Sequence, residues 1–203
     1  NMSSVLTGSI GVYSWDLDDG MVSSAQDTSL VYALSGIYSI TLNVETGFGC
    51  TNSVNHSLEV YNNPVADFST ANVCQNEQAI FNDNSTSLSG NISNWDWDMN
   101  DGTILNLGSG VIFNHDYATA NTYNVELIVT TEHGCDDTII NPIVIHPIPI
   151  VNFSFDIACY NYPTSFTDLS TLSSGTINGW DWNFNGTLVS GNQNPQFTFF
   201  QPG

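Results

Sequence analysis

Three copies of a short acidic turn are the first residues with a capacity for chemistry. They read WDLDDG at 15–20, WDMNDG at 97–102 and a degraded WNFNG at 182–186. Their oxygen-bearing members are Asp16, Asp18, Asp19, Asp98, Asn100 and Asp101. Calcium favours such ligands, but an EF-hand loop places them at fixed steps through about twelve residues ending in Glu, and no such Glu follows. Asp-Gly is typical of tight hairpin turns with positive φ, so we interpret these segments as turns and predict no metal site.

No enzyme motif accompanies these turns. The chain contains no GxSxG, no HExxH and no phosphate-binding glycine loop. The four histidines, His56, His115, His133 and His146, show no recurring metal-ligand spacing. Asp96 and Asp98 lie two apart on one strand face and have the chemistry for glycoside hydrolysis, but a repeat of about 85 residues leaves little room for a cleft. We therefore predict no catalytic residue and no cofactor.

The tryptophan that opens each turn has two readings. Trp15, Trp97 and Trp182 occupy alternating strand positions, where a large apolar side chain fills a β-sandwich core. Exposed aromatic side chains can instead stack on sugars. We favour core positions, and burial of all three would remove the best argument for a glycan-binding module.

The charge composition narrows the class of partner. The 203 residues are 41% hydrophobic and 12% aromatic, enough for globular cores, yet they include 20 Asp and Glu and no Lys or Arg, for a net charge of -20. Without cationic side chains there is no patch to neutralise phosphates. No stretch reaches the roughly 20 apolar residues of a membrane helix. We expect neither nucleic acid nor membrane contact by this segment.

An internal repeat sets the architecture. The string at 64–74 recurs at 149–159, Trp95-Asp96-Trp97 recurs as Trp180-Asp181-Trp182, and Gly49-Cys50 recurs as Gly134-Cys135, always at an offset of 85. We predict a partial repeat at 1–62 that lacks its opening strands, a complete repeat at 63–148, and a partial repeat at 149–203 that lacks its closing strands.

Each repeat reads as a series of short strands. TYNVELIVT places Tyr123, Val125, Leu127 and Val129 on one face, and IYSITLNVE places Tyr38, Ile40, Leu42 and Val44 on one face. About seven such strands with polar turns and no amphipathic helix are typical of an antiparallel immunoglobulin-like β-sandwich. Pro142 cannot donate to a strand ladder, so its strand is predicted at a sheet edge or a bulge.

The order of a WDxxDG turn, a Y-x-x-x-G step and a Y-x-V-x-L-x-V strand resembles PKD domains. The step reads YALSG at 32–36, YATAN at 117–121 and FFQPG at 199–203. The added cysteines resemble the variant found in very large secreted surface proteins of gliding bacteria that use type IX secretion. The resemblance implies tandem all-β PKD modules that act as spacers, stalks or adhesive arrays, or as accessories to secreted hydrolases.

The four cysteines lack any CxxC pair, which indicates disulfides in an oxidising compartment rather than a metal site. We favour a bond between Cys74 and Cys135, which closes a loop of about 60 residues and stabilises by roughly 4 kcal/mol in the chain-entropy description. Cys50 and Cys159 then pair outside this segment. Two alternatives stay open: Cys50 with Cys74 and Cys135 with Cys159, or bonds between a cysteine at one pole of a module and the Gly-Cys turn of the next module or of another chain.

These features predict a non-enzymatic extracellular or cell-surface protein. The leading hypothesis is a spacer or stalk of a filament or giant adhesin, with neighbouring repeats and identical chains as partners. The alternative is a carbohydrate-binding or adhesive module, accessory to a secreted hydrolase, with surface glycans as partners.

Overall fold

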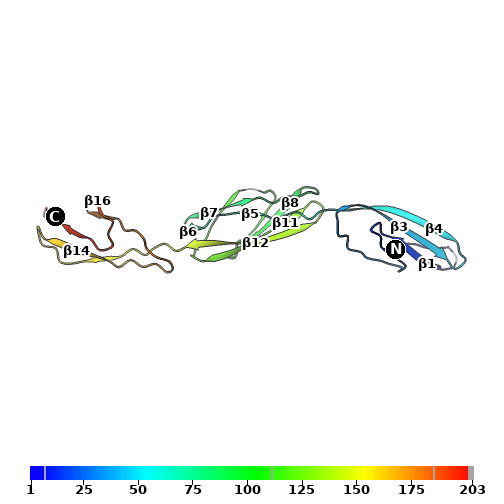
Figure 1. The fold of residues 1–203 in the computed structure, drawn as a ribbon, viewed down its shortest axis with the longest axis horizontal. Helices are drawn as coiled ribbons and strands as arrows, with labels where there is room; N and C mark the ends of the chain where they lie inside the picture. Colours follow the sequence, from blue (N-terminus) through cyan, green and yellow to red (C-terminus); the bar gives the residue numbers. More distant parts are fainter. Residues whose placement is uncertain (7, 111, 185, 201–203) are drawn as a thin grey trace.

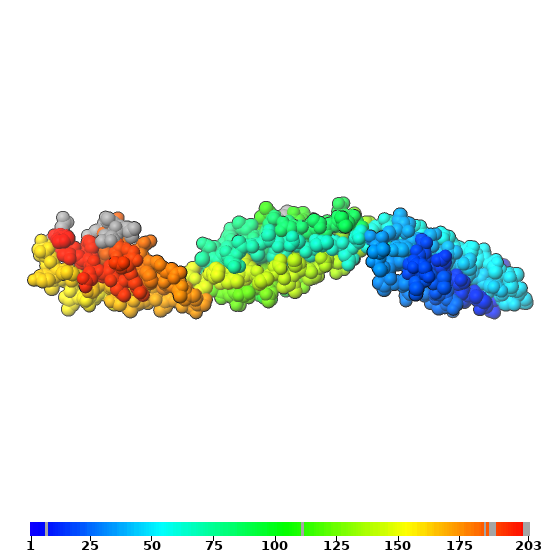
Figure 2. Space-filling model, in the orientation of Figure 1, coloured from blue at the N-terminus to red at the C-terminus, as the bar shows by residue number. Residues whose placement is uncertain are grey.

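The computed structural model describes residues 1–6, 8–110, 112–184 and 186–200 of the 203-residue chain. Its regular elements are all β-strands, and they form three units that lie end to end (Figure 1). The first and middle units abut, whereas a narrow waist separates the middle from the third (Figure 2). The all-β fold class is confirmed.

The first unit is one antiparallel sheet in the order β2-β1-β3-β4. Its strands are β1 (Ile10–Asp16), β2 (Val22–Ser23), β3 (Gly36–Thr46) and β4 (Thr51–Val60). Leu42 of β3 is buried, while Tyr38, Ile40 and Val44 on the same face are half-buried. The period-two pattern therefore identified the inner face, which carries only one sheet among the described residues.

The middle unit is a two-sheet sandwich. One sheet has the order β10-β7-β5 and the other β6-β12-β11-β8-β9. The strands are β5 (Phe68–Ser69), β6 (Val73–Cys74), β7 (Gln78–Asp83), β8 (Ile92–Asp98), β9 (Ile104–Leu107), β10 (Phe113–Asp116), β11 (Thr122–Thr131) and β12 (Asp136–His146). The predicted alternating run of β11 faces inward, because Val125, Leu127 and Val129 are completely buried.

The core of the middle unit is built on aromatic side chains from both sheets. Trp97 is 1% exposed and meets Phe68 and Phe113 edge to face, at centroid distances of 5.0 Å in each case. Phe81 stacks on Phe113 at 5.3 Å. Edge-to-face and offset pairs add to the stabilisation from burial alone. This arrangement explains why the tryptophan that opens the acidic turn is a core residue here.

Pro142 lies in the middle of β12, opposite Asn124 of β11. On the other side of β12, β6 pairs only with the last two residues, Ile145 and His146, and in parallel. Pro142 therefore faces an open sheet edge within the described residues, where its missing N–H breaks no ladder bond. The edge position predicted from the sequence is confirmed.

The third unit repeats the opening half of the middle unit. Its strands are β13 (Phe153–Phe155), β14 (Pro163–Asp168), β15 (Trp182–Phe184), β16 (Thr187–Ser190) and β17 (Gln196–Thr198). They form a sheet β13-β14-β17 and a hairpin β15-β16. The bridge Ile150–Thr171 repeats Val65–Thr86 of the middle unit. Up to residue 200, no strand corresponds to β11 or β12.

Candidate functional sites: acidic turns, an aromatic groove and a unit junction

The acidic turns use their side chains to hold their own backbone. In the middle unit Asp98 Oδ1 accepts from Asn100 N at 2.8 Å, and Asp101 Oδ1 accepts from Thr103 N at 2.9 Å. The first unit repeats both bonds, from Asp18 N to Asp16 and from Met21 N to Asp19. The left-handed backbone at Asp18 and Asn100, with φ of 62° and 61°, suits short polar side chains. These contacts favour the turn interpretation over calcium ligation.

In the first and middle units a tyrosine further along the chain donates a hydrogen bond to the turn. Tyr117 Oη donates to Met99 O at 3.1 Å in the middle unit, and Tyr32 Oη donates to Leu17 O at 3.0 Å in the first. Burial, and then the nearby Asp101 carboxylate, raise the pKa of Tyr117 above its ordinary 10.0. This tyrosine stays neutral and serves as a structural donor.

His115 is the histidine that touches a turn acid. Its Nε2 lies 2.7 Å from Asp101 Oδ2, and both side chains are largely buried. Burial acts to raise the pKa of Asp101, but hydrogen bonds from His115 and Thr103 outweigh it, so this pKa lies below 3.8. Because His115 belongs to β10 and Asp101 follows β8, the pair ties the two sheets together. Its role is structural.

Asp96 and Asp98 alternate with the buried Trp95 and Trp97 along β8, which places both carboxylates on the outer face, Asp98 at the end of the strand. Asp96 accepts hydrogen bonds from Asn94 Nδ2 at 2.7 Å and from Asn106 Nδ2. Two carboxylates on an outer sheet face, each of them already engaged by amide donors, lack the enclosed geometry of a glycosidase site. Across the described ranges there is also no group of three His, Cys, Asp or Glu side chains placed to hold a metal ion.

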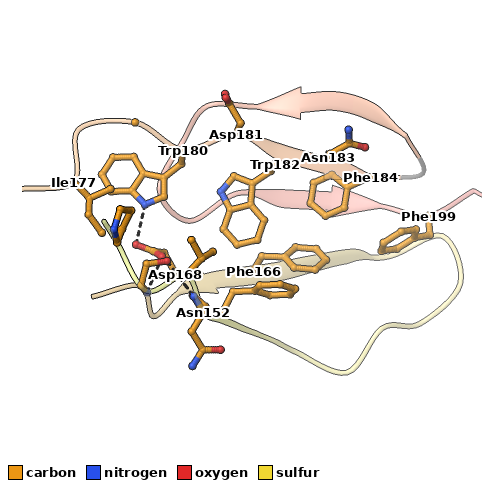
Figure 3. Close-up of a pocket in the computed structure, with 15 residues that line it drawn as sticks. Asn152, Phe166, Asp168, Ile177, Trp180, Asp181, Trp182, Asn183, Phe184 and Phe199 are labelled. Carbon is orange, nitrogen blue, oxygen red and sulfur yellow. Dashed lines mark hydrogen bonds between the residues drawn. The ribbon is translucent and has the colours of Figure 1, made fainter. Parts of the chain in front are cut away.

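The third unit contains a groove walled by aromatic rings (Figure 3). Its volume is about 450 Å³, and its lining includes Phe153, Phe166, Trp180, Trp182, Phe184 and Phe199. Asp168 sits on one wall, where it accepts from Trp180 Nε1 at 2.8 Å and from Gln193 Nε2 at 3.2 Å. Hydrogen bonds from Ser170, with those from Trp180 and Gln193, lower the pKa of Asp168 to about 2. Phe153, Phe166 and Trp182 stand 85 residues after the core residues Phe68, Phe81 and Trp97, so the groove is the inner face of a repeat that this segment contains only in part.

The three tryptophans that open the turns are not equivalent. Trp97 is buried, whereas Trp15 and Trp182 are half-buried. The prediction of three core tryptophans is therefore confirmed for Trp97 alone. Trp15 and Trp182 belong to the two repeats that this segment contains only in part.

A stacked aromatic pair joins the first and middle units. Tyr61 directly follows β4, and its ring lies 3.7 Å from the His133 ring at an interplanar angle of 1°. His133 belongs to the β11–β12 turn of the middle unit. A hydrogen bond to Glu59, with burial, raises the pKa of Tyr61 above 10.0. The linker therefore contacts the middle unit through a parallel aromatic stack.

Two further contacts define the same junction. Asn62 donates to Ser89 Oγ through both its backbone N, at 3.1 Å, and its Nδ2, at 3.0 Å. Gly90 packs so closely against His133 that an added Cβ would lie 2.8 Å from the ring, and its φ of 80° also favours glycine. His133 is held between Gly90 and Tyr61. Sequence reasoning did not identify this junction, although an aromatic residue directly after a strand was a usable signal.

The cysteines lie at opposite poles of their units. Cys74 pairs with His146 at the end of β12, while Cys135 directly precedes the start of the same strand at Asp136. Ten to eleven residues of strand, at about 3.3 Å each, separate them, far beyond the roughly 7 Å limit between bridged Cα atoms. The favoured bond from Cys74 to Cys135 is therefore wrong for this fold. All four cysteines are unpaired in this structure.

The architecture defines a class of tandem immunoglobulin-like β modules, and a family comparison narrows it. The PKD domain model matches residues 1–60 and 61–145. The chain therefore belongs to the PKD domain family. Such domains are typical of extracellular or secreted proteins and are generally non-catalytic. None of the described elements is a helix of the length and hydropathy needed to cross a membrane.

Solved structures give weaker likenesses. The PKD1 domain of Vibrio anguillarum Epp is 20% identical, covers 44% of this chain and 100% of its own, and has a TM-score of 0.40. The PKD1 domain of the Vibrio cholerae metalloprotease PrtV is 26% identical over 41% of this chain and 98% of its own, with a TM-score of 0.37. A carbohydrate-binding module of the β-sandwich superfamily is 22% identical over 68% of this chain and 53% of its own length, with a TM-score of 0.43. No curated protein matches the chain.

Proposed function

We propose that this chain is a spacer segment of an extracellular stalk, filament or large surface adhesin of the type that gliding bacteria export by type IX secretion. Its neighbours in that assembly are other repeats and identical chains. The single observation that carries the proposal is the junction of Tyr61, Asn62, Ser89 and His133, because a flexible tether between independent modules would need no such contacts. We retain the unit boundaries 1–62, 63–148 and 149–203.

Short linkers with specific contacts favour a defined angle between modules. The Tyr61–His133 stack restrains one face of the linker, and the two bonds from Asn62 to Ser89 restrain the next residue. An aromatic pair contributes about 0.5–1.5 kcal/mol beyond its buried area, and each hydrogen bond about 0.5–1.5 kcal/mol. Together these contributions shift a hinge equilibrium several-fold or more toward one orientation.

The cation-free surface suits a spacer as well. With a net charge of -20 and no Lys or Arg, the chain cannot form inter-chain ion pairs through those side chains, and it resists association at neutral pH. Trypsin has no cleavage site in this sequence. Both properties are useful to an exposed structural protein.

Small-angle X-ray scattering with residual dipolar couplings tests the spacer proposal. The native chain should scatter as an extended particle, with one alignment tensor shared by the first and middle units. Tyr61→Ala combined with Asn62→Ala should give the two units separate tensors, while Tyr160→Ala, an exposed aromatic away from the junction, should not. Separate tensors in the native chain would overturn the proposal.

A second candidate function is that of an adhesive module that binds surface glycans, accessory to a secreted hydrolase. Exposed aromatic rings that stack on sugars would carry it. Calorimetry with soluble polysaccharides tests it: binding by the native chain supports this function, and the absence of any heat of binding would contradict it.

A further inference from the structure

The first unit carries the same polar turn as the middle unit. In both, the turn threonine N donates to the cysteine O, at 2.9 Å for Thr46–Cys50 and 2.8 Å for Thr131–Cys135. The cysteine N donates back to the threonine Oγ1 at 3.2 Å in each. Gly49 and Gly134 have φ of 79° and 82°. The two turns have the same hydrogen bonds, so side chains at corresponding positions point in corresponding directions.

The residue before the Gly-Cys pair packs on a glycine in both units. His133 covers Gly90 in the middle unit. Phe48 covers Gly8 in the first, where a Cβ built on Gly8 would lie 3.4 Å from the Phe48 ring and the φ of Gly8 is 90°. A backbone bond anchors the turn beside the glycine each time, from Gly47 N to Ser9 O and from Glu132 N to Asn91 O. Phe48 and Gly8 therefore form a counterpart of the His133–Gly90 pair.

The two aromatic residues differ in what lies on their outer face. The His133 ring carries Tyr61 stacked on one face, although the residue as a whole is still exposed. Phe48 is 86% exposed and sits on the β3–β4 turn, at the end of the first unit that points away from the middle unit (Figure 1). Phe48 and Gly8 therefore reproduce the His133–Gly90 contact but lack the stacked ring that Tyr61 supplies at the junction.

We propose that Phe48 and Gly8 form a docking seat for the linker of another PKD unit, whose aromatic residue stacks on Phe48 as Tyr61 stacks on His133. This inference rests on the proposed spacer function and names the partner of the pole of the first unit that carries Phe48. The occupant is an extended segment with an aromatic residue directly after its last strand, because that is the placement of Tyr61 after β4. Gly47 stands where the middle unit has Glu132, so the seat is less acidic and suits an uncharged ring.

A tethered segment tests the seat. Residues 57–63, which include Tyr61, are fused ahead of Asn1 through a flexible Gly/Ser linker of about ten residues, which raises the local concentration of the segment to the millimolar range. We expect ring-current shifts at the Phe48 ring protons and nuclear Overhauser contacts between Phe48 and the added tyrosine. The shifts should vanish when that tyrosine is replaced by Ala and when the seat carries Phe48→Ser.

Two outcomes would overturn the inference. One is the absence of any shift at Phe48 with the tethered tyrosine. The other is an equal shift when the tethered tyrosine is replaced by Leu, since that response would indicate a general apolar patch rather than an aromatic seat. As a matched test in the native junction, His133→Phe should keep a common alignment tensor for the first and middle units and His133→Ala should lose it. If the native junction is rigid but the seat stays empty, the spacer proposal survives and only the seat fails.

Discussion

The middle and third units place the same residue types at positions 85 apart, yet one set forms a core and the other forms a groove. Phe68 and Phe81 are 4% and 0% exposed, whereas Phe153 and Phe166 are 50% and 8% exposed. β11 and β12 cover the middle set, whereas at the same offset of 85 their counterparts in the third repeat would fall after residue 203, so the comparison isolates what these two strands contribute. The alternating pattern of a strand thus determines which side chains face inward, and the strands packed over that face determine whether those side chains are excluded from solvent.

The largest expected loss of stability follows from replacing Trp97, which β11 and β12 help to bury. Trp97→Ala should destabilise the middle unit by about 3–5 kcal/mol, because it removes a fully buried ring and leaves a cavity. Trp182→Ala should cost clearly less, since its ring is half-exposed already. Chemical denaturation followed by tryptophan fluorescence and unit-resolved NMR measures both. Equal losses would contradict the view that covering strands set the difference.

A smaller effect is expected for the tyrosine that donates to the turn in the first and middle units. Tyr117→Phe leaves the buried Met99 carbonyl without its donor and should cost about 1–3 kcal/mol. Tyr32→Phe removes the equivalent bond in the first unit, where the ring is half-buried and water can replace the hydroxyl. Thermal unfolding of the two single variants compares the sites. A larger loss for Tyr32→Phe than for Tyr117→Phe would show that burial does not control this bond.

The smallest effect concerns pH. The folded pKa of Asp168 is about 2, below its ordinary 3.8, so its hydrogen bonds contribute stability that is present above pH 3.8 and is lost as the pH falls toward 2. Asp168→Asn should lower stability at neutral pH and flatten this part of the profile. Circular dichroism melts between pH 5 and 2 measure it. A profile that keeps its full slope in Asp168→Asn would assign the acid response to other carboxylates.

The fold was predictable from local pattern, because period-two alternation, turn residues and an exact repeat describe strands without reference to distant residues. Pro142 is a clear case: a missing donor requires an open edge, and the structure provides one. The same reasoning failed for Cys74 and Cys135. Their spacing permits a bond, but the length of β12 separates them within one sheet, and the parallel pairing of β6 with the far end of β12 is not encoded in local pattern.

The candidate sites were harder to predict for the same reason. The exposure of Trp182 depends on what covers it, and the stack of Tyr61 on His133 joins a linker to a turn more than seventy residues later. A periodic signal was present in hindsight: positions 48 and 133 are both aromatic and both precede Gly-Cys. It identifies the turn residue but not the ring that covers it.

The parallel pairing of β6 with the end of β12 affects how the middle unit responds to a pulling force. The chain enters the unit from the side of the first unit, reaches β6, and finally leaves along β12 toward the third unit (Figure 1). Tension between the two ends of the middle unit therefore pulls β6 and β12 in opposite directions and loads the contacts Val73–Ile145 and Cys74–His146 in shear, together rather than in sequence. Resistance to force is a matter of unfolding rate, and this short pairing shares the load with the Val65–Thr86 bridge and the β5–β7 pairing, which lie nearer the point where the chain enters the unit.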